Sequence, residues 1–304
     1  MSPRAWAAFA AMSVLWGGSY LLIEIAERDG LPALWVAWVR IGTGALALLI
    51  LAARAGTLPA LRGRGRWLLA YAVSELVIPF PMIALGETHV ASSLTAIIIA
   101  TVPLFGALLA LRFDHEERPT PIRALGLGLG FVGVVALVGL DVAGHGAELL
   151  GVGAILLAAV GYAIAPLILK HRLAGLDPRA MMAACLTMAT IVITPAALLD
   201  LPARGLAGVG SGAIAAVLTL GLVCTAAALV IFAVLIREAG PARATVITYV
   251  NPLVALALGV WLESERPGAG ALLGLVLILL GSGLATTGAL PGAAWRRSRR
   301  IEIR

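Results

Sequence analysis

The chain has 304 residues, of which 61% are hydrophobic and only 12% are charged, and its net charge is +6. Soluble domains are about 45–50% apolar and about 25% charged, so this chain has too few polar residues to cover a water-soluble globule. The composition argues against a soluble enzyme, a nucleic-acid-binding domain, a disulfide scaffold and a disordered chain, and it points to a polytopic protein of the lipid bilayer. The two cysteines, Cys185 and Cys224, lie in apolar runs and give neither a disulfide framework nor a metal-ligand spacing.

Apolar stretches long enough to span a bilayer recur along the whole chain. A spanning helix needs about 20 mainly apolar residues, and the connections between these stretches are too short for a soluble domain. We therefore predict an all-α integral membrane protein with ten transmembrane helices. The predicted helices cover residues 5–25, 33–53, 67–86, 91–111, 122–140, 149–169, 180–199, 212–235, 242–262 and 269–289.

Basic residues are distributed very unequally between the two sides that ten alternating spans define. Eighteen of them fall on the side of the N-terminus, and only Arg28, Arg204 and Arg266 fall on the other side. Because cytoplasmic loops are enriched in Lys and Arg, we predict a multi-pass protein of the inner (plasma) membrane with both termini in the cytoplasm. The first apolar stretch is longer than the core of a signal peptide and runs on without a clean cleavage site, so we expect it to be retained.

Sequence patterns recur at a separation of 148 to 149 residues. A Glu-Arg-Pro triplet repeats at 148 residues, and the span-centre prolines Pro103 and Pro252 are 149 residues apart. We infer two related halves of five spans each, residues 1–146 and 147–290, followed by a basic cytoplasmic tail at 291–304. Since five is odd, the second half must enter the membrane from the opposite face. Such inverted repeats are typical of transporters that expose one central site alternately to the two sides.

Several short motifs together resemble one transporter family. They are Leu15-Trp16-Gly17 in the first span, Arg40 in the second, the prolines Pro103 and Pro252 with an acidic residue 13 or 14 positions later (Glu116 or Glu117, and Glu265), and the glycine-rich span that follows in each half. In this order, and duplicated, they make residues 5–289 similar to the EamA-type members of the drug/metabolite transporter superfamily. Arg40 departs from the duplication, because Leu186 stands at the matching position of the second half.

The resemblance implies a secondary transporter that exports amino acids or other small metabolites, and in some cases drugs. It also implies a central cavity lined by most of the spans, with the fifth and tenth spans at the periphery. Those two spans carry glycines at i, i+4 spacing, Gly126 with Gly130 and Gly270 with Gly274, and this spacing lets helices approach closely. It allows a homodimer without requiring one, so both a monomer and a homodimer stay open.

No motif in the sequence favours an enzyme, a cofactor or a metal site. The G-x-G-x-x-G pattern at 128–133 lies inside a continuous apolar span, so helix packing explains it better than nucleotide binding does. The histidines His89, His115, His145 and His171 lie near span ends or in loops and lack metal-ligand spacing. We therefore expect no catalytic residues, no cofactor, no metal and no nucleic-acid partner.

Two charged residues lie within predicted spans, where an ionised group costs roughly 2.5–3.5 kcal/mol and must face protein or water. Glu75 lies in the third span and Arg40 in the second, at depths from which the long arginine can reach the carboxylate. One interpretation is a fixed internal salt bridge. The other is that Glu75 titrates, carrying a coupling proton or meeting a substrate amine. The sequence leaves both open.

Prolines and polar-tipped aromatic residues mark the other candidate positions. A proline within a helix leaves the carbonyl four residues earlier unpaired, which is that of Glu75 for Pro79 and that of Thr248 for Pro252. Such carbonyls are tolerated at membrane depth where they line a cavity, and Pro103 and Pro252 act either as hinges or as static kinks. The residues predicted to line the substrate cavity are Trp16, Tyr20, Glu75, Tyr162, Thr248, Tyr249 and Asn251, and those predicted to have structural or coupling roles are Arg40, Glu75, Pro79, Pro103 and Pro252.

These patterns predict a secondary transporter that exports small organic metabolites, foremost amino acids or amphipathic amines, across the inner membrane by alternating access. An exporter of toxic organic cations or drugs is the alternative, with Glu75 as the counter-charge. A membrane-embedded enzyme is a more distant alternative, because it calls for clustered His, Asp or Cys near one interface, and the sequence lacks such a cluster. The substrate and the coupling ion stay open.

Overall fold

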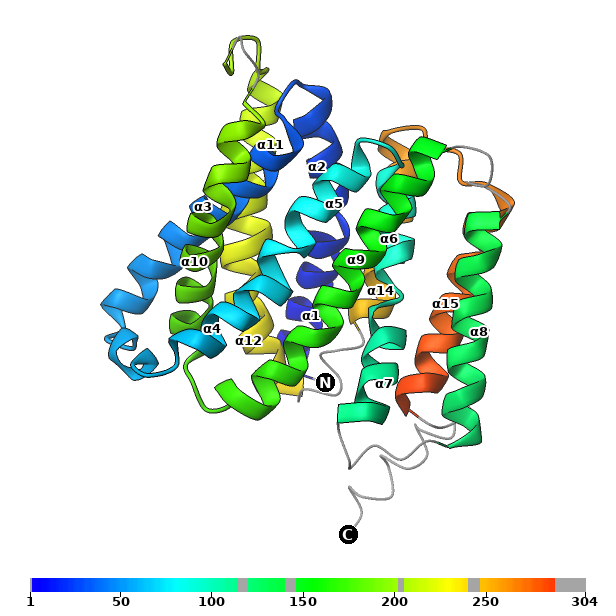
Figure 1. Ribbon diagram of the computed structural model, residues 1–304, viewed down its shortest axis with the longest axis horizontal. Coiled ribbons are helices and arrows are strands. Elements are labelled where there is room, and N and C mark those ends of the chain that lie inside the picture. The colour runs from blue at the N-terminus through cyan, green and yellow to red at the C-terminus, as the bar shows by residue number, and fades with distance from the viewer. Residues whose placement is uncertain (1, 114–119, 140–145, 202–204, 240–246, 288–304) are drawn as a thin grey trace.

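The computed structural model describes residues 2–113, 120–139, 146–201, 205–239 and 247–287, and all regular structure in these ranges is helical (Figure 1). The first part of the chain forms α1 (Pro3–Gly17), α2 (Ser19–Arg28), α3 (Ala33–Arg54), the 3-10 helix η1 (Leu58–Leu61), α4 (Gly65–Ala72), the π-helical η2 (Val73–Val77), α5 (Pro79–Glu87), α6 (Ser92–Ile99), α7 (Val102–Phe113) and α8 (Pro121–Leu137). The second part forms α9 (Gly146–Ile168), the π-helical η4 (Leu169–Leu173), α10 (Pro178–Leu199), α11 (Ser211–Gly221), the π-helical η5 (Leu222–Ala227), α12 (Ala228–Ala239), α14 (Ile247–Leu262) and α15 (Ala269–Thr287).

Eight helical stretches are long and apolar enough to cross a membrane. They are Pro3–Arg28, Ala33–Arg54, Gly65–Glu87, Ser92–Ala110, Gly146–Leu173, Pro178–Leu199, Ser211–Ala239 and Ala269–Thr287. The predicted spans at 122–140 and 242–262 correspond to the shorter apolar helices α8 and α14 within the described residues. The composition and these helices make the chain an all-helical integral membrane protein.

Several long stretches are interrupted within the bundle. The stretch Pro3–Arg28 breaks at Gly18, between α1 and α2, and the stretch Ser92–Ala110 breaks at Ala100, between α6 and α7. Pro103 was expected at the centre of a continuous span, but it lies in the first turn of α7, directly after this break. Pro252 does lie inside a continuous helix, α14. The two repeat-related prolines therefore have different local structures. Pro103 lies at the start of a helix, where backbone N–H groups have no partner within the helix, so the N–H that proline lacks costs no hydrogen bond.

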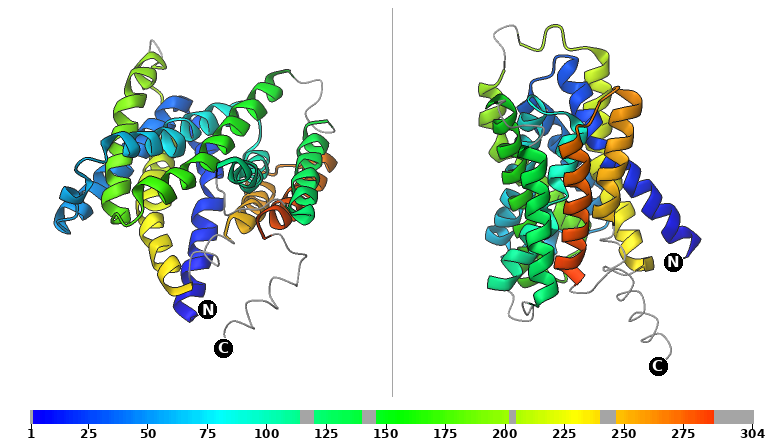
Figure 2. Two further views of the ribbon diagram at one scale, coloured as in Figure 1. Left: turned by 60° about the horizontal axis from the view of Figure 1, so that its bottom comes forward. Right: turned by 90° about the vertical axis from the view of Figure 1, so that its right-hand side faces the viewer.

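Helices from the two parts of the chain pack against one another in pairs. α3 packs on α10, α8 on α15, α5 on α9, α2 on α11 and α6 on α14. The α8–α15 pair stands at one edge of the bundle and the α3–α10 pair at the opposite edge (Figures 1 and 2). The beginning of α1 and the end of α15 lie at the same end, here called the near end; the opposite one is the far end (Figure 1).

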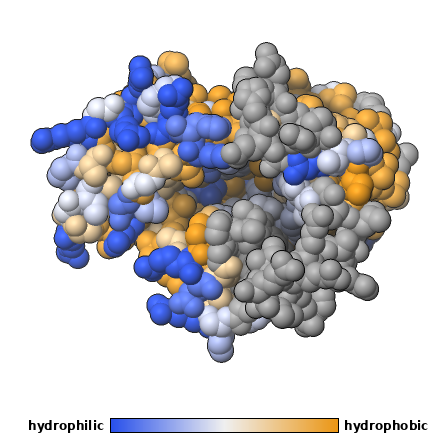
Figure 3. All heavy atoms as spheres, turned by 90° about the horizontal axis from the view of Figure 1, so that it is seen from below, coloured by the Kyte–Doolittle hydropathy of each residue, from blue (hydrophilic) through white to orange (hydrophobic). Residues whose placement is uncertain are grey.

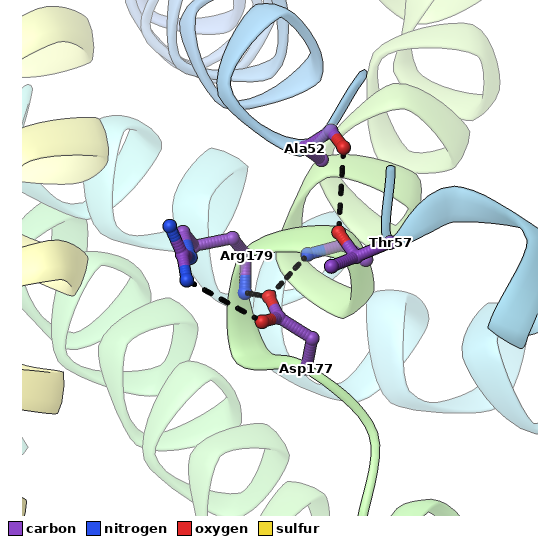
Figure 4. A network of polar contacts seen from close by, with 5 residues as sticks. Ala52, Thr57, Asp177 and Arg179 are labelled. Carbon is purple, nitrogen blue, oxygen red and sulfur yellow. Dashed lines mark hydrogen bonds and ion pairs between the residues drawn. The ribbon is translucent and has the colours of Figure 1, made fainter. Parts of the chain in front are cut away.

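Side-chain hydrogen bonds join α3 to α10 towards the far end, and another caps α10 at the near end. At the far end, the Asp200 carboxylate accepts a hydrogen bond from the backbone N–H of Leu34 at 3.2 Å, in the first turn of α3. Below it, the Trp38 indole donates to Thr194 Oγ1 at 2.9 Å. At the near end, the Asp177 carboxylate accepts from the backbone N–H of Arg179 at 2.8 Å and caps α10 (Figure 4). Each cap satisfies amides that would otherwise lack partners at a helix start.

Figure 4 also shows how the near end of this pair is arranged. Thr57, just beyond α3, donates to the carbonyl of Ala52 at 3.4 Å and lies beside the capped start of α10. The two helices therefore run antiparallel, with the end of each beside the beginning of the other.

The α8–α15 contact depends on glycine. A Cβ on Gly281 would lie 2.4 Å from the backbone N of Gly130 and 2.6 Å from the carbonyl O of Gly126. A Cβ on Gly274 would lie 2.9 Å from the carbonyl O of Gly133. Because the obstructing atoms are backbone, the two helices touch at distances that no larger residue permits.

The surface of the bundle matches a bilayer. Large side chains such as Val135, Leu150 and Ile191 are exposed on its outside, 69%, 72% and 67% respectively, and contiguous apolar surface of this kind needs lipid to cover it. Exposed arginines gather at the near end, among them Arg62 and Arg64. Figure 3 views the molecule from that end, and hydrophilic side chains crowd the left of the view.

Candidate functional site

Four of the predicted residues lie in one central neighbourhood. Tyr162 of α9 is within electrostatic range of Glu75, Arg40 and Tyr20. Tyr162 and Tyr20 also pack against the same apolar cluster, formed by residues of α2, α3, α5 and α11. Both tyrosines and Glu75 are half-buried, and Arg40 is 9% exposed. The structure thus brings together Tyr20 of α2, Arg40 of α3, Glu75 of η2 and Tyr162 of α9.

Arg40 is held by an alcohol and an aromatic ring. Its Nε donates a hydrogen bond to Thr225 Oγ1 at 3.2 Å, and its guanidinium carbon lies 4.3 Å from the centre of the Phe80 ring, which is cation–π geometry. Across the described residues, no ion pair joins Arg40 to Glu75. The fixed salt bridge considered from the sequence is therefore not formed in this structure, and η5 and α5 supply the contacts of Arg40 instead.

Glu75 lies on a π-helical turn that precedes Pro79. The N–H of Ile78 donates to the carbonyl of Val73, five residues earlier, at 3.0 Å. A proline cannot make the regular bond to the carbonyl four residues earlier, and the wider turn accommodates that loss. Such π-turns within helices are frequent at functional sites. Here the turn carries the half-buried carboxylate of Glu75 into the centre of the bundle.

A close approach of α9 supports this turn. A Cβ on Gly161 would lie 2.6 Å from the carbonyl O of Ser74 and 3.1 Å from Pro79 Cγ. Any side chain at Gly161 would push η2 away from α9. Gly161 immediately precedes Tyr162, so the same contact fixes both Glu75 and Tyr162 in position.

A second group of predicted residues lies along the contact between α1 and α14. A Cβ on Gly17 would lie 2.9 Å from the carbonyl O of Asn251 and 2.7 Å from Val254 Cβ, so the glycine of the Leu15-Trp16-Gly17 motif lets α1 touch α14. The Trp16 ring lies against Phe232 of α12, with 5.1 Å between ring centres. Among the described residues, the buried Asn251 Oδ1 has no hydrogen-bond partner.

The other two predicted residues of α14 are half-buried. Tyr249 Oη forms a hydrogen bond with Thr286 Oγ1 of α15 at 2.9 Å, and Thr248 precedes it in the same turn. The predicted residues thus form two groups, a central group and an α1–α14 group. Trp16 and Tyr20, four residues apart across the break at Gly18, connect them.

A set of acidic residues near the far end is not among the residues predicted from the sequence. Glu24 and Glu27 of α2 and Glu87, the last residue of α5, are close enough to act on one another electrostatically. Each has at least one buried carboxylate oxygen that lacks a hydrogen-bond partner in the described parts of the chain. The signal was present, because Glu24 and Glu27 stand one turn apart inside an apolar stretch.

Polar contacts join distant segments of the chain at the far end. Arg28 forms an ion pair with Glu263, and Ser92 Oγ donates to Glu265 Oε1 at 2.9 Å. The backbone N–H of Gly210 donates to the carbonyl of Asp29 at 2.9 Å. These contacts join the end of α2 to the start of α11, and they join both the end of α2 and the start of α6 to the segment between α14 and α15. Glu116 and Glu117, the first-half acidic residues matched with Glu265, lie outside the described residues.

Comparison with known proteins places this architecture among transporters. A family model, described as the EamA-like transporter family, matches residues 4–139 and again residues 149–287. The uncharacterized inner membrane transporter YedA of Escherichia coli K12 is 30% identical over 290 residues, which are 92% of this chain and 90% of the relative. A probable terminal-alkyne amino-acid exporter of Streptantibioticus cattleyicolor is 29% identical over 308 residues, which are 92% of this chain and 93% of the relative.

A solved crystal structure shares the fold. It covers 95% of this chain and 99% of its own, with a TM-score of 0.66 at 19% sequence identity. The family model alone accounts for nearly all of the described residues, and the inner-membrane relative agrees with the apolar helices in making this a multi-pass inner-membrane protein. The chain belongs to the EamA-like transporter family.

Proposed function

We propose that this protein exports amino acids across the inner membrane by alternating access, through a central site made by Tyr20, Arg40, Glu75 and Tyr162. The observation that carries the proposal is that Tyr162 lies within electrostatic range of both Glu75 and Arg40, which form no ion pair with each other in the described parts of the chain. A zwitterionic amino acid complements both, with its ammonium group at Glu75 and its carboxylate at Arg40. Charge-assisted bonds of this kind are the strong ones in binding sites.

The α1–α14 group would form the wall for the substrate side chain. Trp16, Tyr249 and Asn251 combine apolar rings with a few polar atoms, as small-molecule sites do. Thr248 completes this wall. The exporter from Streptantibioticus cattleyicolor, named for an amino acid, supports the same substrate class.

The proposed architecture has ten transmembrane helices in two inverted five-helix halves, residues 1–146 and 147–290, followed by the tail at 291–304. The two matches of the family model support two related halves. So do the packing pairs: exchanging the halves turns the α5–α9 contact into the contact between α1 and α12, and it maps α3–α10, α6–α14 and α8–α15 onto themselves. The π-helical segments η2 and η5 also begin 149 positions apart, at Val73 and Leu222.

In this proposal the near end faces the cytoplasm and both termini lie there. The gathering of exposed arginines at the near end supports this orientation. The contacts Arg28–Glu263 and Ser92–Glu265 would then hold the outer side closed. The prolines Pro79, Pro103 and Pro252 would let the helices bend as the halves rock.

The test is uptake of a labelled panel of amino acids and organic cations into proteoliposomes that contain the purified protein. We expect several amino acids to be taken up and to exchange with unlabelled amino acid inside. Glu75→Gln should lower this uptake at least tenfold, because the ammonium group loses its partner, and Arg40→Met should do the same through the carboxylate. Glu148→Gln, in the first turn of α9, is the matched control and should transport as the wild type does.

The alternative substrate class has its own outcome in this experiment. If organic cations without a carboxylate are transported and Arg40→Met does not slow them, the protein is a cation exporter with Glu75 as counter-charge. If no solute of either class moves, the transport proposal is wrong.

A further inference from the structure

The far-end carboxylates, defined as Glu24, Glu27 and Glu87, have no role in the substrate site proposed above. Glu87 is the most enclosed, 7% exposed. Both of its carboxylate oxygens are buried and lack a hydrogen-bond partner among the residues that the structure describes. The Thr95 hydroxyl of α6 lies beside it but donates to the carbonyl of Ala91 at 3.3 Å.

The groups that face Glu87 come from each neighbouring element. α2 contributes Tyr20 together with Glu24 and Glu27, and α3 contributes Arg40. α9 contributes apolar contact, with Ile155 against Gly86, the residue before Glu87. In the described chain, Arg40 is the positive charge that acts on Glu87. Arg40 is already bound to Thr225 and Phe80 and forms no ion pair with Glu87.

An ionised Glu87 would be strongly unfavourable in this environment. A buried charge without a partner is costly, and two further carboxylates nearby repel it. A bound cation removes this cost. Within the described ranges, no three His, Cys, Asp or Glu side chains are placed to hold a metal ion. A proton needs a single carboxylate, and Glu87 provides one.

We propose that Glu87, with Glu24 and Glu27 beside it, is a proton-binding site that couples proton entry to export, an inference that rests on the proposed transport function. Glu87 takes a proton from the outer solution when the far end opens. The proton is carried inward as Arg28–Glu263 and Ser92–Glu265 close the far end again, and it leaves to the cytoplasm as substrate binds. One proton then enters for each substrate that leaves, and no other reactant is needed. Glu75 is left to the substrate's ammonium group.

The coupling is tested in proteoliposomes with the labelled amino acid that exchanges best. We expect an imposed pH gradient to drive accumulation by the wild type above the level reached without a gradient, and a pH-sensitive dye to report substrate-linked proton movement. In Glu87→Gln, accumulation should fall to the no-gradient level and the dye signal should vanish. Glu148→Gln should keep both. Glu27→Gln, one turn from Glu24 on α2, serves as a second variant if Glu87→Gln does not purify as a single species.

Measurements on the wild-type protein distinguish failure of the proton-site proposal from failure of the transport proposal. Exchange without any effect of the gradient would overturn the proton site and leave the transport function standing. No exchange of any solute would instead overturn the transport function. Gradient-driven accumulation that persists in Glu87→Gln and Glu27→Gln would place the coupling group elsewhere and overturn the site.

A second measurement needs no substrate. The infrared C=O stretch of protonated carboxylic acids, recorded on the protein in lipid at neutral pH, should be present in the wild type and weaker in Glu87→Gln, while Glu148→Gln should leave it unchanged. A band of full strength in Glu87→Gln would show that Glu87 carries no proton in this state and would contradict the proposal.

Discussion

Arg40 is held in the bundle by groups that cannot neutralise its charge. Thr225 accepts one hydrogen bond from it, and the Phe80 ring attracts it weakly. A guanidinium that was fully paired within the protein could not bind a substrate. The Arg40 guanidinium keeps its charge, and most of its N–H donors are unused among the described residues. The arrangement positions the cation and leaves it available for a carboxylate ligand.

Removing the Thr225 hydroxyl should therefore destabilise the protein. Thr225→Val keeps the shape of the side chain and leaves the buried Arg40 Nε without an acceptor, a loss of about 1–3 kcal/mol. We expect a lower melting temperature for the purified variant. Thr219→Val is the matched control, because the half-buried Thr219 donates only to the carbonyl of Ala215 in its own helix in the described structure. Equal melting temperatures for the two variants would contradict this role.

The sequence identified the charged residues of the central group but not their partners. Arg40 and Glu75 were found because a charge inside an apolar stretch demands an explanation. Thr225 lies 185 residues from Arg40, and such long-range contacts depend on how the helices pack. Glu87 was missed because it ends an apolar stretch, where a charged residue is expected to be in water.

At the scale of the helices, the glycine contact between α8 and α15 brings backbone against backbone and can be tested by substitution. Gly281 faces the backbone of Gly126 and Gly130, while Gly283, two residues later on α15, faces open space. This contact pairs the two peripheral helices, and neither has another helix partner as extensive.

Gly281→Ala should thus separate the helices, and Gly283→Ala should not. Overpacking of this kind costs about 1–3 kcal/mol, and we expect the melting temperature of Gly281→Ala to fall. Alanine is about 1 kcal/mol better than glycine inside a helix, so Gly283→Ala should melt at the wild-type temperature or above it. A thermal-denaturation series on the three proteins measures this, and equal effects of both substitutions would rule out the glycine contact.

Hydrophobic length predicted where the helices are, but not where they break. Each of the ten apolar stretches corresponds to described helix within a few residues at most ends. The break at Gly18 and the π-turns η2 and η5 escaped notice, because they depend on neighbouring helices rather than on local hydropathy. Of these features, only η2 has a local signal in the sequence, because Pro79 lacks the N–H for a regular helical hydrogen bond.

At the scale of the whole molecule, the closed far end is held by few contacts. Arg28 and Glu263 form a partly exposed ion pair, and pairs of that kind contribute at most about 1 kcal/mol. The closed and open states can therefore be close in free energy, as alternating access requires.

Breaking that ion pair should open the far end more often. In a background with Cys185 and Cys224 replaced, a cysteine at Ser93, which is 3% exposed, reports opening to a membrane-impermeant maleimide added outside. We expect Arg28→Ala to raise its labelling rate by up to about fivefold, the factor that about 1 kcal/mol supplies. Arg266→Ala, another arginine at this end, is the control. A labelling rate that Arg28→Ala leaves unchanged would show that this ion pair does not hold the far end closed.

The central claim is that one site is exposed alternately to the two sides of the membrane. Its most direct test is the labelling of Glu75→Cys, in the same background, by an impermeant maleimide applied to intact cells and to inverted vesicles. Leu206→Cys and Arg62→Cys mark the outer and inner faces. We expect Glu75→Cys to react from both faces, Leu206→Cys to react only in cells, and Arg62→Cys to react only in vesicles. Reaction of Glu75→Cys from a single face would contradict alternating access through this site.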